Sequence, residues 1–370
     1  MEKESYKIGK ERKLKIMQIA PIYIPINPNL KYGGIERVVL ALGKTFNEKG
    51  HNVITAAPAD SKPYGNLLPT LDRSEWTKPK IWGEDPLAYE KHVSKIIEYL
   101  LKGPVDVVHD HTGNFVLNEI FKENSKKYSK LKTIPFIVTP HELRRFAKIS
   151  PPDQKNITFT TLSDYQKNVF SGYVNVEAVI NNGIEVGTYP FQEKKENFLF
   201  SIGSIERDKG QDLAVKVSLE SGIPLKIAGN IVEKDFYDLE IKRYAPHVEY
   251  VGELNDISKK EFYKKAIASV LPIRIGDCFT LTRIESLACG TPVITLGTGS
   301  AKEAIKNGYN GYVVPYNPKR EDKAVNLMKD SLSNIYKINK SNCRKTVEDN
   351  FTWDKIADQY IELYRSKCNP

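Results

Sequence analysis

Short apolar runs alternate with amphipathic stretches along the first half of the chain. The amphipathic stretches carry apolar residues at helical spacing and lie at 35–49, 87–101 and 115–127. The apolar runs predict buried strands at 13–20, 52–57, 105–109, 134–139, 157–162 and 178–181. Alternation of strand and helix is typical of a parallel β-sheet with helices on both faces.

The same alternation restarts in the second half. Strands are predicted at 197–202, 225–228, 248–251, 268–272, 292–296 and 311–314, and helices near 211–220, 233–243, 258–266, 283–289 and 299–307. We therefore predict two doubly wound α/β domains, at 1–190 and 191–352, with a cleft between their strand C-termini, where open α/β sheets bind ligands. A last amphipathic helix, at 353–365 with Thr352 as its N-cap, follows them.

Composition and charge narrow the class of protein. At 370 residues the chain is long enough for two cores, and its four cysteines form no C-x-x-C pair, which favours a reducing compartment. The charged first residues do not resemble a signal peptide, and no apolar run approaches ~18 residues, so we expect a cytoplasmic protein.

The net charge of +9 is spread along the chain without an aromatic-basic string, which argues against nucleic acid as a binding partner. It suits nucleotide sugars, anionic acceptors or an anionic lipid surface, and equally a solvated Lys-rich face.

Two carboxylates stand eight positions apart in the second half of the chain. Asp277 and Glu285 flank an apolar segment of about two helical turns, so both carboxylates can face one cleft. Carboxylates accept hydrogen bonds from paired hydroxyls, as in sugars and ribose. A solvated Asp before an ordinary helix with one buried Glu explains the spacing equally well.

Residues 276–296, GDCFTLTRIESLACGTPVITL, also resemble the acidic signature of the retaining glycosyltransferases of family 4. That signature usually runs Glu-x7-Glu followed by Ala-Cys-Gly-Thr-Pro-Val. This chain keeps Glu285 and the run 289–293, but has Asp277 at the first acid and Thr280 where the family often has Gly. The resemblance implies that Asp277 holds sugar hydroxyls, that Glu285 holds ribose hydroxyls, and that the amides of Thr280 and Leu281 lie near the donor diphosphate.

The resemblance covers nearly the whole chain, from about residue 13 to the tail. It implies the GT-B fold, in which two Rossmann-like domains face a central cleft. It also implies that the C-terminal helix, 353–370, packs back on the first domain.

Gly33 and Gly34 follow the first strand and open the first helix. Two glycines let an anion approach the backbone, and a helix N-terminus offers free N–H groups. A glycine turn needed only for packing is the alternative. The string GGIERVV resembles the family's first-domain loop, which implies that the Gly34 amide lies near the donor diphosphate.

The first strand of the second domain runs into residues 202–210, IGSIERDKG. They resemble the family motif Gly-Arg-x4-Lys-Gly, whose Arg and Lys neutralise the donor diphosphate. Lys209 keeps its place, Ser204 stands where the Arg would be, and Arg207 lies three positions downstream. If the motif is disregarded, Lys209 is interpreted as an ordinary solvated lysine at the start of a helix.

Three histidines end strands of the first domain. His109 and His111 share one face, and their spacing offers no third ligand, so we predict no metal site. His141 ends the next strand and should point into the cleft, where an imidazole donates to a substrate hydroxyl. A hydrogen bond within the turn is the alternative. The family's strand-end His contacts the donor sugar, so the resemblance gives that role to His141, ahead of His111.

Together these features predict a hexosyltransferase that moves a sugar from a nucleotide diphosphate donor to a hydroxyl acceptor. The resemblance to the family implies that the transfer retains the configuration at the anomeric carbon. Catalysis is assigned to His141, Lys209 and Asp277, without metal or cofactor. Family frequency favours UDP, with GDP and ADP open. The acceptor, a sugar, a lipid-linked or a small molecule, should dock near 58–85 and Arg144-Arg145, and peripheral contact with the inner membrane face stays open.

Other functions fit the sequence less well than glycosyl transfer. The departures at Asp277 and Ser204 keep open a non-catalytic sugar-nucleotide-binding protein or assembly partner. A nucleotide-sugar epimerase shares the two-domain architecture and the ligand class, and remains a minor alternative. A nicotinamide dehydrogenase and a serine hydrolase would need G-x-G-x-x-G and G-x-S-x-G, and neither motif occurs in the expected place.

Overall fold

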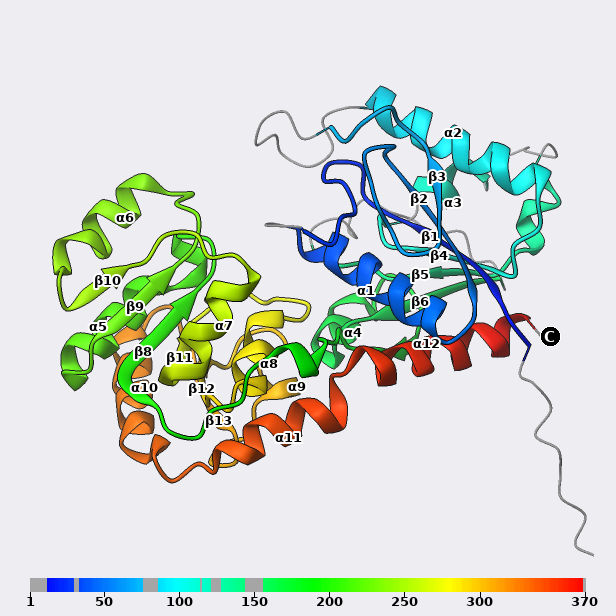
Figure 1. Ribbon diagram of the computed structural model, residues 1–370. Helices are drawn as coiled ribbons and strands as arrows, with labels where there is room; N and C mark the ends of the chain where they lie inside the picture. The colour runs from blue at the N-terminus through cyan, green and yellow to red at the C-terminus, as the bar shows by residue number, and fades with distance from the viewer. Residues whose placement is uncertain are drawn as a thin grey trace, which may run out of the picture. The chain divides into compact units, whose positions relative to one another are not determined.

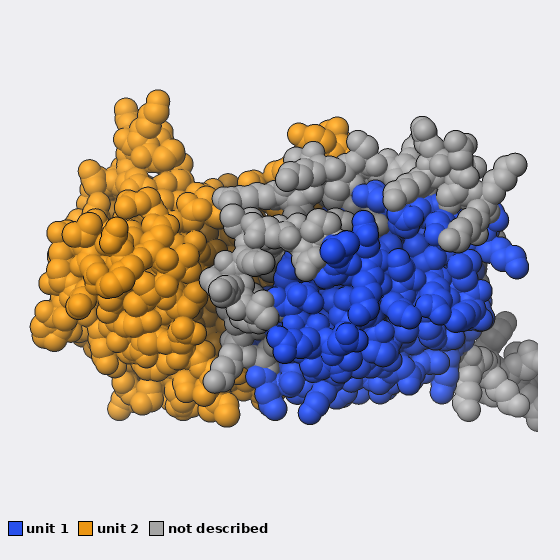
Figure 2. All heavy atoms as spheres, turned by 90° about the horizontal axis from the view of Figure 1, so that it is seen from above, with its two compact units in different colours: residues 1–141, 148–160, 360–370 blue, residues 142–147, 161–359 orange. Residues whose placement is uncertain are grey.

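The computed structural model of the chain describes residues 12–29, 33–75, 86–113, 115–120, 128–143 and 156–368. The chain forms two compact units, coloured separately in Figure 2. The first comprises residues 1–141, 148–160 and 360–370, and the second comprises residues 142–147 and 161–359. Figure 1 labels their helices and strands.

A seven-stranded sheet forms the core of the first half of the chain, in the order β3-β2-β1-β4-β5-β6-β7. Its strands are β1 (Lys15–Ile19), β2 (Asn52–Ala57), β3 (Asn66–Pro69), β4 (Val107–Asp110), β5 (Phe136–Val138), β6 (Ile157–Thr161) and β7 (Val176–Val179). The pairs from β3 through β6 are parallel. Strand order reverses between β1 and β4, and ligands of open α/β sheets bind at such a switch point.

The helices that accompany this sheet are α1 (Gly34–Glu48), α2 (Pro86–Lys102), α3 (Phe115–Ile120), α4 (Asp164–Phe170) and α12 (Trp353–Cys368). Helix α1 and the end of α12 contact the same face of the sheet. The Gln18 amide in β1 donates to the Val39 carbonyl of α1 at 3.2 Å, and Tyr364 of α12 is hydrogen-bonded to His109 of β4 at 2.6 Å. In Figure 1, α2 and α3 lie on the other face.

A six-stranded parallel sheet forms the core of the second unit, in the order β10-β9-β8-β11-β12-β13. Its strands are β8 (Glu196–Ile202), β9 (Leu225–Ala228), β10 (Val248–Tyr250), β11 (Ala266–Leu271), β12 (Val293–Leu296) and β13 (Gly311–Val314). The helices are α5 (Gln211–Ser221), α6 (Lys234–Glu240), α7 (Asp256–Lys265), α8 (Leu281–Ala288), α9 (Ala301–Ala304), α10 (Glu321–Ile335) and α11 (Lys340–Asn350). Strand β11 is buried along its whole length, which explains its nearly continuous apolar sequence; its one polar residue, Ser269, accepts a hydrogen bond from Ser286 at 2.7 Å.

The predicted α/β class and the two parallel sheets are confirmed, whereas three details were wrong. The segment 58–85, for which no strand was predicted, contains the edge strand β3, which ends in Pro69 and is too short to show an alternating pattern. The helix expected over 299–307 is only α9, because the Asn310 side chain accepts from the Lys306 amide at 2.8 Å and donates to the Ala304 carbonyl at 2.9 Å. Helices α4, α10 and α11 were missed.

The domain boundary at residue 190 stays a prediction. The last strand of the first sheet ends at Val179 and the first strand of the second begins at Glu196. Within the described ranges, none of the helices combines the length and the apolar character needed to cross a bilayer.

Candidate active site

The carboxyl ends of β4 and β5 bring three histidines together. Asp110 of β4 pairs with Val138 of β5, so the residues that follow each strand leave the sheet side by side. His111 Nδ1 lies 3.1 Å from His141 Nε2, and the two rings are stacked with centroids 5.3 Å apart. The ring of His109 lies 3.9 Å from that of His111. The structure thus places the two predicted histidines, His111 and His141, in direct contact.

Burial keeps these imidazoles neutral. It lowers the pKa of His141 to about 3 and holds the pKa values of His109 and His111 well below 6.5. A neutral imidazole has one donor and one acceptor, and the bond between His111 and His141 uses one of each. The pair therefore presents one donor and one acceptor outward. His111 Nε2, a buried atom, has no hydrogen-bond partner among the described residues and is one of these two positions.

The two glycines at the N-terminus of α1 differ in what surrounds them. Gly33 has φ +119°, and a Cβ there would lie 2.7 Å from Oε2 of Glu36, so a side chain would be strained. At Gly34 a Cβ would meet no atom of the described residues within 4 Å, so these residues leave the positive end of α1 open on that side. Lys31 and Tyr32, which precede the glycines, lie outside the described residues, as do Arg144 and Arg145.

In the second unit, Lys209 ends a short 3₁₀ turn, η5 (Arg207–Lys209), between β8 and α5. The guanidinium of Arg274 holds this turn: Nη1 donates to the Arg207 carbonyl at 2.7 Å, and Nη1 and Nη2 each donate to the Asp212 carboxylate at 2.7 Å. Gly210 follows with φ +71°, packed against Pro272. The Lys209 amino group is half-buried and forms no hydrogen bond or ion pair with the described residues. Arg274 was not identified from the sequence.

The other two residues of this motif face different surroundings. Arg207 is exposed, and its guanidinium lies over the ring of Phe236 in α6, 5.4 Å from the ring centroid. Ser204 is half-buried and accepts a hydrogen bond on its carbonyl from the Gln211 amide at 2.7 Å. Lys209 is therefore the motif cation whose side chain is left available.

Asp277 forms an ion pair inside the second unit. Its Oδ1 accepts from Arg283 Nη1 at 3.1 Å and from Ser300 Oγ at 2.5 Å, and its Oδ2 accepts from Arg283 Nη2 at 2.9 Å. The Arg283 side chain is 1% exposed and the Asp277 side chain 15%. Gly299 makes the close approach possible, because a Cβ there would lie 2.3 Å from the Asp277 amide. Arg283 was not identified from the sequence, and the predicted contact of Asp277 with sugar hydroxyls stays a prediction.

Glu285 lies on α8 and is buried in a second hydrogen-bonded cluster. Its Oε1 accepts from Lys259 Nζ at 2.6 Å and from the Tyr189 hydroxyl at 3.1 Å, and its Oε2 accepts from the Tyr263 hydroxyl at 3.3 Å. Burial, with Glu285 nearby, raises the pKa of both phenols well above 10, so they remain donors. The carboxylate is thus held rigidly, and its predicted contact with ribose stays a prediction.

Thr280 and Leu281 form the start of α8. Thr280 is the N-cap residue, in extended conformation, and its side chain makes no capping hydrogen bond. The first amides of α8 are therefore not capped by that side chain, and they form the positive end of the helix.

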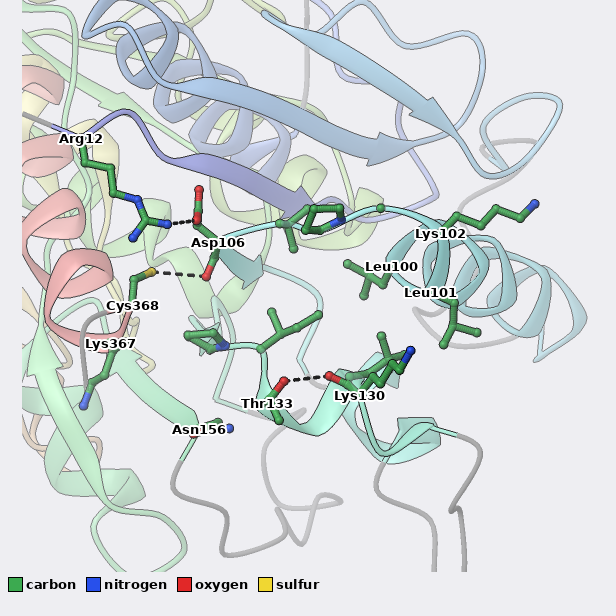
Figure 3. A pocket seen from close by; sticks show the side chains of 16 residues that line it. Arg12, Leu100, Leu101, Lys102, Asp106, Lys130, Thr133, Asn156, Lys367 and Cys368 are labelled. Carbon is green, nitrogen blue, oxygen red and sulfur yellow. Dashed lines mark hydrogen bonds and ion pairs between the residues drawn. The ribbon is translucent and has the colours of Figure 1, made fainter.

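A cavity of about 600 Å³ lies at the opposite edge of the first sheet, where β4, β5 and β6 begin and α2 and α12 end. Figure 3 shows the amino groups of Lys102, Lys130 and Lys367 pointing in different directions rather than at one point. The acid in its wall, Asp106, is bound by Arg12 at 2.5 Å and by the Lys15 amide at 2.7 Å. This cavity contains none of the strand-end residues, so we do not place the donor there.

Within the described parts of the chain, no group of three His, Cys, Asp or Glu side chains is arranged to hold a metal ion.

Comparison with known proteins identifies the family of the chain. Residues 32–186 match the family model for Glycosyltransferase Family 4, and residues 190–348 match that for Glycosyl transferases group 1. An uncharacterized glycosyltransferase of Methanocaldococcus jannaschii is 23% identical over 91% of this chain and 96% of its own. A phosphatidyl-myo-inositol mannosyltransferase of Mycobacterium tuberculosis is 23% identical over 90% of this chain and 93% of its own. A second uncharacterized M. jannaschii glycosyltransferase is 26% identical, over 58% of this chain and 55% of its own.

Solved structures show the same fold. AviGT4, a glycosyltransferase involved in avilamycin A biosynthesis, has a TM-score of 0.71 at 23% identity, over 96% of this chain and 98% of its own. Anabaena HepE in complex with UDP and glucose has a TM-score of 0.71 at 14% identity, over 95% of this chain and 100% of its own. With two family models that together match most of the chain, and with this fold, the chain belongs to the family 4 glycosyltransferases of the GT-B fold.

Proposed function

We propose that this glycosyltransferase moves a hexosyl group from a nucleotide diphosphate sugar to a hydroxyl acceptor, with retention at the anomeric carbon. The observation that carries the proposal is Lys209. It is the motif cation with an available amino group, on a turn that Arg274 holds in place. A fixed cation of this kind suits the diphosphate leaving group, on which negative charge develops during transfer.

The remaining residues fit the other parts of the donor. The N-terminal amides of α1 at Gly34 and of α8 at Leu281 would add partial positive charge near the diphosphate. The His111–His141 pair would offer a hydrogen bond to the sugar, whose transition state resembles an oxocarbenium ion. Charge neutralisation by side chain and backbone makes a metal ion unnecessary in this mechanism.

The donor we favour is a UDP-sugar. The structure of Anabaena HepE was solved with UDP and glucose, and family frequency points to the same nucleotide. GDP and ADP sugars complete the panel of donors to be tested.

For the acceptor we propose a sugar, a lipid-linked or a small-molecule hydroxyl, bound by the first domain. One relative is named for mannosyl transfer to phosphatidyl-myo-inositol, which makes a lipid-linked acceptor a reasonable first test. A cytoplasmic enzyme with peripheral contact at the inner membrane face would reach such an acceptor, and the net charge of +9 favours contact with anionic lipid.

One observation favours a second function, a non-catalytic nucleotide-sugar-binding protein. The charge of Asp277 is already neutralised by the buried Arg283. Its carboxylate is therefore a weaker hydrogen-bond acceptor for the donor sugar than an unpaired acid would be. A protein that only binds would still need Lys209 for the diphosphate.

Thermal shift with a panel of UDP-, GDP- and ADP-sugars, followed by donor hydrolysis, separates these functions. A ligand at about 100 times its Kd stabilises the folded state by about 2.7 kcal/mol, so the correct donor should raise Tm clearly. We expect one nucleotide class to bind and to be hydrolysed slowly without acceptor. Binding without hydrolysis or transfer would support the second function. No binding by any nucleotide sugar would contradict both.

A further inference from the structure

A row of polar side chains is buried on the face of the first sheet that meets the end of α12. It consists of His109 on β4, Thr139 after β5, Thr160 on β6, and Tyr360 and Tyr364 on α12, each no more than 2% exposed. A buried polar group is costly unless it is hydrogen-bonded. This row is therefore expected to be a connected network.

The distances show that it is connected. The Tyr364 hydroxyl lies 2.6 Å from His109 Nδ1, and His109 Nε2 lies 2.7 Å from Thr139 Oγ1. Thr139 Oγ1 lies 2.6 Å from Thr160 Oγ1 and 3.3 Å from the Tyr360 hydroxyl. Both ring nitrogens of His109 are thus used, one toward each end of the network.

The network has a preferred direction. His109 is neutral because burial lowers its pKa, so one ring nitrogen carries a proton and the other does not. Tyr364 is fully buried and keeps its proton, because burial raises its pKa well above 10. Within the described part of the chain, His109 Nδ1 is the acceptor in reach of that hydroxyl proton. Tyr364 therefore donates to Nδ1, and the ring proton of His109 lies on Nε2 and is donated to Thr139.

Fixing His109 has a consequence for the donor site. The His109 ring lies 3.9 Å from His111, tilted by 37°, and His111 in turn contacts His141 at 3.1 Å. A rotation of His109 would displace the ring of His111 that packs on it. The orientation of the strand-end pair thus depends on a side chain 255 residues away from His109 in the sequence.

We propose that Tyr364 is a positioning residue that holds His109 in its Nε2–H tautomer and, through it, sets the His111–His141 pair for the donor sugar. The first part stands on the hydrogen-bond geometry together with the neutral state of His109, and it does not depend on the transfer function. The second part rests on the proposed transfer function. Tyr360 is a weaker member of the network, because its 3.3 Å contact competes with the 2.6 Å contact to Thr160.

Tyr364→Phe tests the proposal with little loss of packing, because the ring that packs edge-on against Phe46, at 5.7 Å, is kept. Histidine ¹⁵N NMR of the full chain should show one tautomer, Nε2–H, for His109 in the wild type. It should show a mixture in Tyr364→Phe, since Nδ1 has then lost its donor. The His109 signals are assigned by their absence in His109→Asn.

The second part of the proposal is tested by kinetics. With the donor identified by the thermal-shift panel, we expect kcat of Tyr364→Phe to fall about tenfold, as when the orienting partner of a functional histidine is removed. The KM for the donor nucleotide should change by less than about twofold, because the diphosphate contacts are untouched.

Tyr336→Phe is the matched control, because Tyr336 is 64% exposed and distant in sequence from the network. Thr139→Val removes the partner of Nε2 but leaves Tyr364 donating to Nδ1, so this variant should keep the Nε2–H tautomer and separates the role of Tyr364 from that of Thr139. If Tyr364→Phe fails to fold, the wild-type spectrum decides the first part, because a His109 ring that carries its proton on Nδ1 would overturn the proposal. An unchanged His109 tautomer in Tyr364→Phe would also overturn it. A changed tautomer with unchanged kcat would overturn its second part. Absence of transfer in the wild type would contradict the proposed function, and the NMR result would still decide the role of Tyr364.

Discussion

Arg283 forms two hydrogen bonds with Asp277, six residues earlier in the chain, at 3.1 and 2.9 Å. Its side chain is 1% exposed, so its charge is balanced by this one carboxylate in a largely water-free environment. Breaking a buried pair by removing one partner is costly, because the other charge is left buried without compensation. Asp277 therefore has a structural role in addition to any role toward the donor sugar.

Asp277→Asn should lower the free energy of unfolding by about 3 kcal/mol, since Asn keeps the shape but leaves the Arg283 charge unbalanced. Urea denaturation measures the change. Asp349→Asn is the control, because Asp349 forms an exposed ion pair with Lys345 at 3.0 Å, and exposed pairs contribute little to stability. Equal, small effects of the two substitutions would show that the Arg283 pair is not a structural element. If Asp277→Asn is folded and still binds nucleotide but does not transfer, the acid also serves the sugar.

Lys209→Ala should reduce kcat/KM by a factor of about 10² to 10³, corresponding to about 2–4 kcal/mol of transition-state stabilisation. The reason is that no other side-chain cation of the motif is available, since Arg207 lies over Phe236. Initial rates across donor concentrations give the value. Lys216→Ala, an exposed lysine on α5, should stay close to wild type. Activity of Lys209→Ala within a few-fold of wild type would rule out its role at the diphosphate.

Removal of divalent metal should leave transfer intact. The proposed mechanism neutralises the leaving diphosphate with Lys209 and with the N-terminal amides of α1 and α8, so it requires no ion. Transfer is measured after dialysis against excess EDTA, with and without added Mg²⁺ or Mn²⁺. Loss of activity under EDTA that a divalent cation restores would contradict the mechanism and assign the charge neutralisation to a metal.

The fold was predictable from the sequence because most of its strands are buried on both faces and therefore appear as mostly apolar runs. Strand β11 (Ala266–Leu271) is an example in which every residue is buried. The elements missed lack such a signal. Strand β3 (Asn66–Pro69) is a partly exposed edge strand of four residues, and helices α10 and α11 follow β13, the last strand, where the alternation has ended.

The candidate site was only partly predictable. His111 and His141 were identified because adjacent parallel strands deliver their C-terminal residues to one place. The residues that fix the positions of these side chains were not identified from the sequence. Arg274 meets Asp212 across 62 positions and Tyr364 meets His109 across 255, and no local pattern marks such pairs. Arg283 occupies a helix position where a buried arginine is unexpected until its partner is seen.

Glu285 and Lys259 should behave as a coupled pair in a double-mutant cycle. The two side chains are 7% and 11% exposed and lie 2.6 Å apart, so each single substitution leaves the partner's charge poorly compensated. Glu285→Gln and Lys259→Met should each be destabilising, and the double variant should be less destabilised than the sum of the two by about 1–3 kcal/mol. Urea denaturation of the four proteins gives the coupling. Additive effects would indicate that the 3.0 Å contact of Lys259 with Asp256 balances its charge instead.

Lys195 should make stability depend on pH in the alkaline range. Its Nζ donates to the Lys264 carbonyl at 2.9 Å, to the Cys289 carbonyl at 2.9 Å and to Thr291 Oγ1 at 2.8 Å, yet burial lowers its pKa from 10.5 to about 8. Below pH 8 the amine is protonated in both the folded and the unfolded chain, so Lys195 adds no pH dependence to the free energy of unfolding there. Between about pH 8 and 10.5 the unfolded chain binds the proton and the folded chain does not. The contribution of Lys195 to stability therefore rises with pH across this window.

Other groups titrate in the same window, so the measurement is a difference between two proteins. Unfolding free energies of wild type and Lys195→Met are compared by urea denaturation from pH 7 to pH 10.5. Methionine has a similar length and no charge, so it removes the titration while filling much of the same space. The difference in unfolding free energy between wild type and Lys195→Met should stay constant from pH 7 to about pH 8. Above pH 8 this difference should change in favour of the wild type. Parallel curves for the two proteins over the whole range would mean that the Lys195 ammonium keeps its ordinary pKa, compensated by its three acceptors.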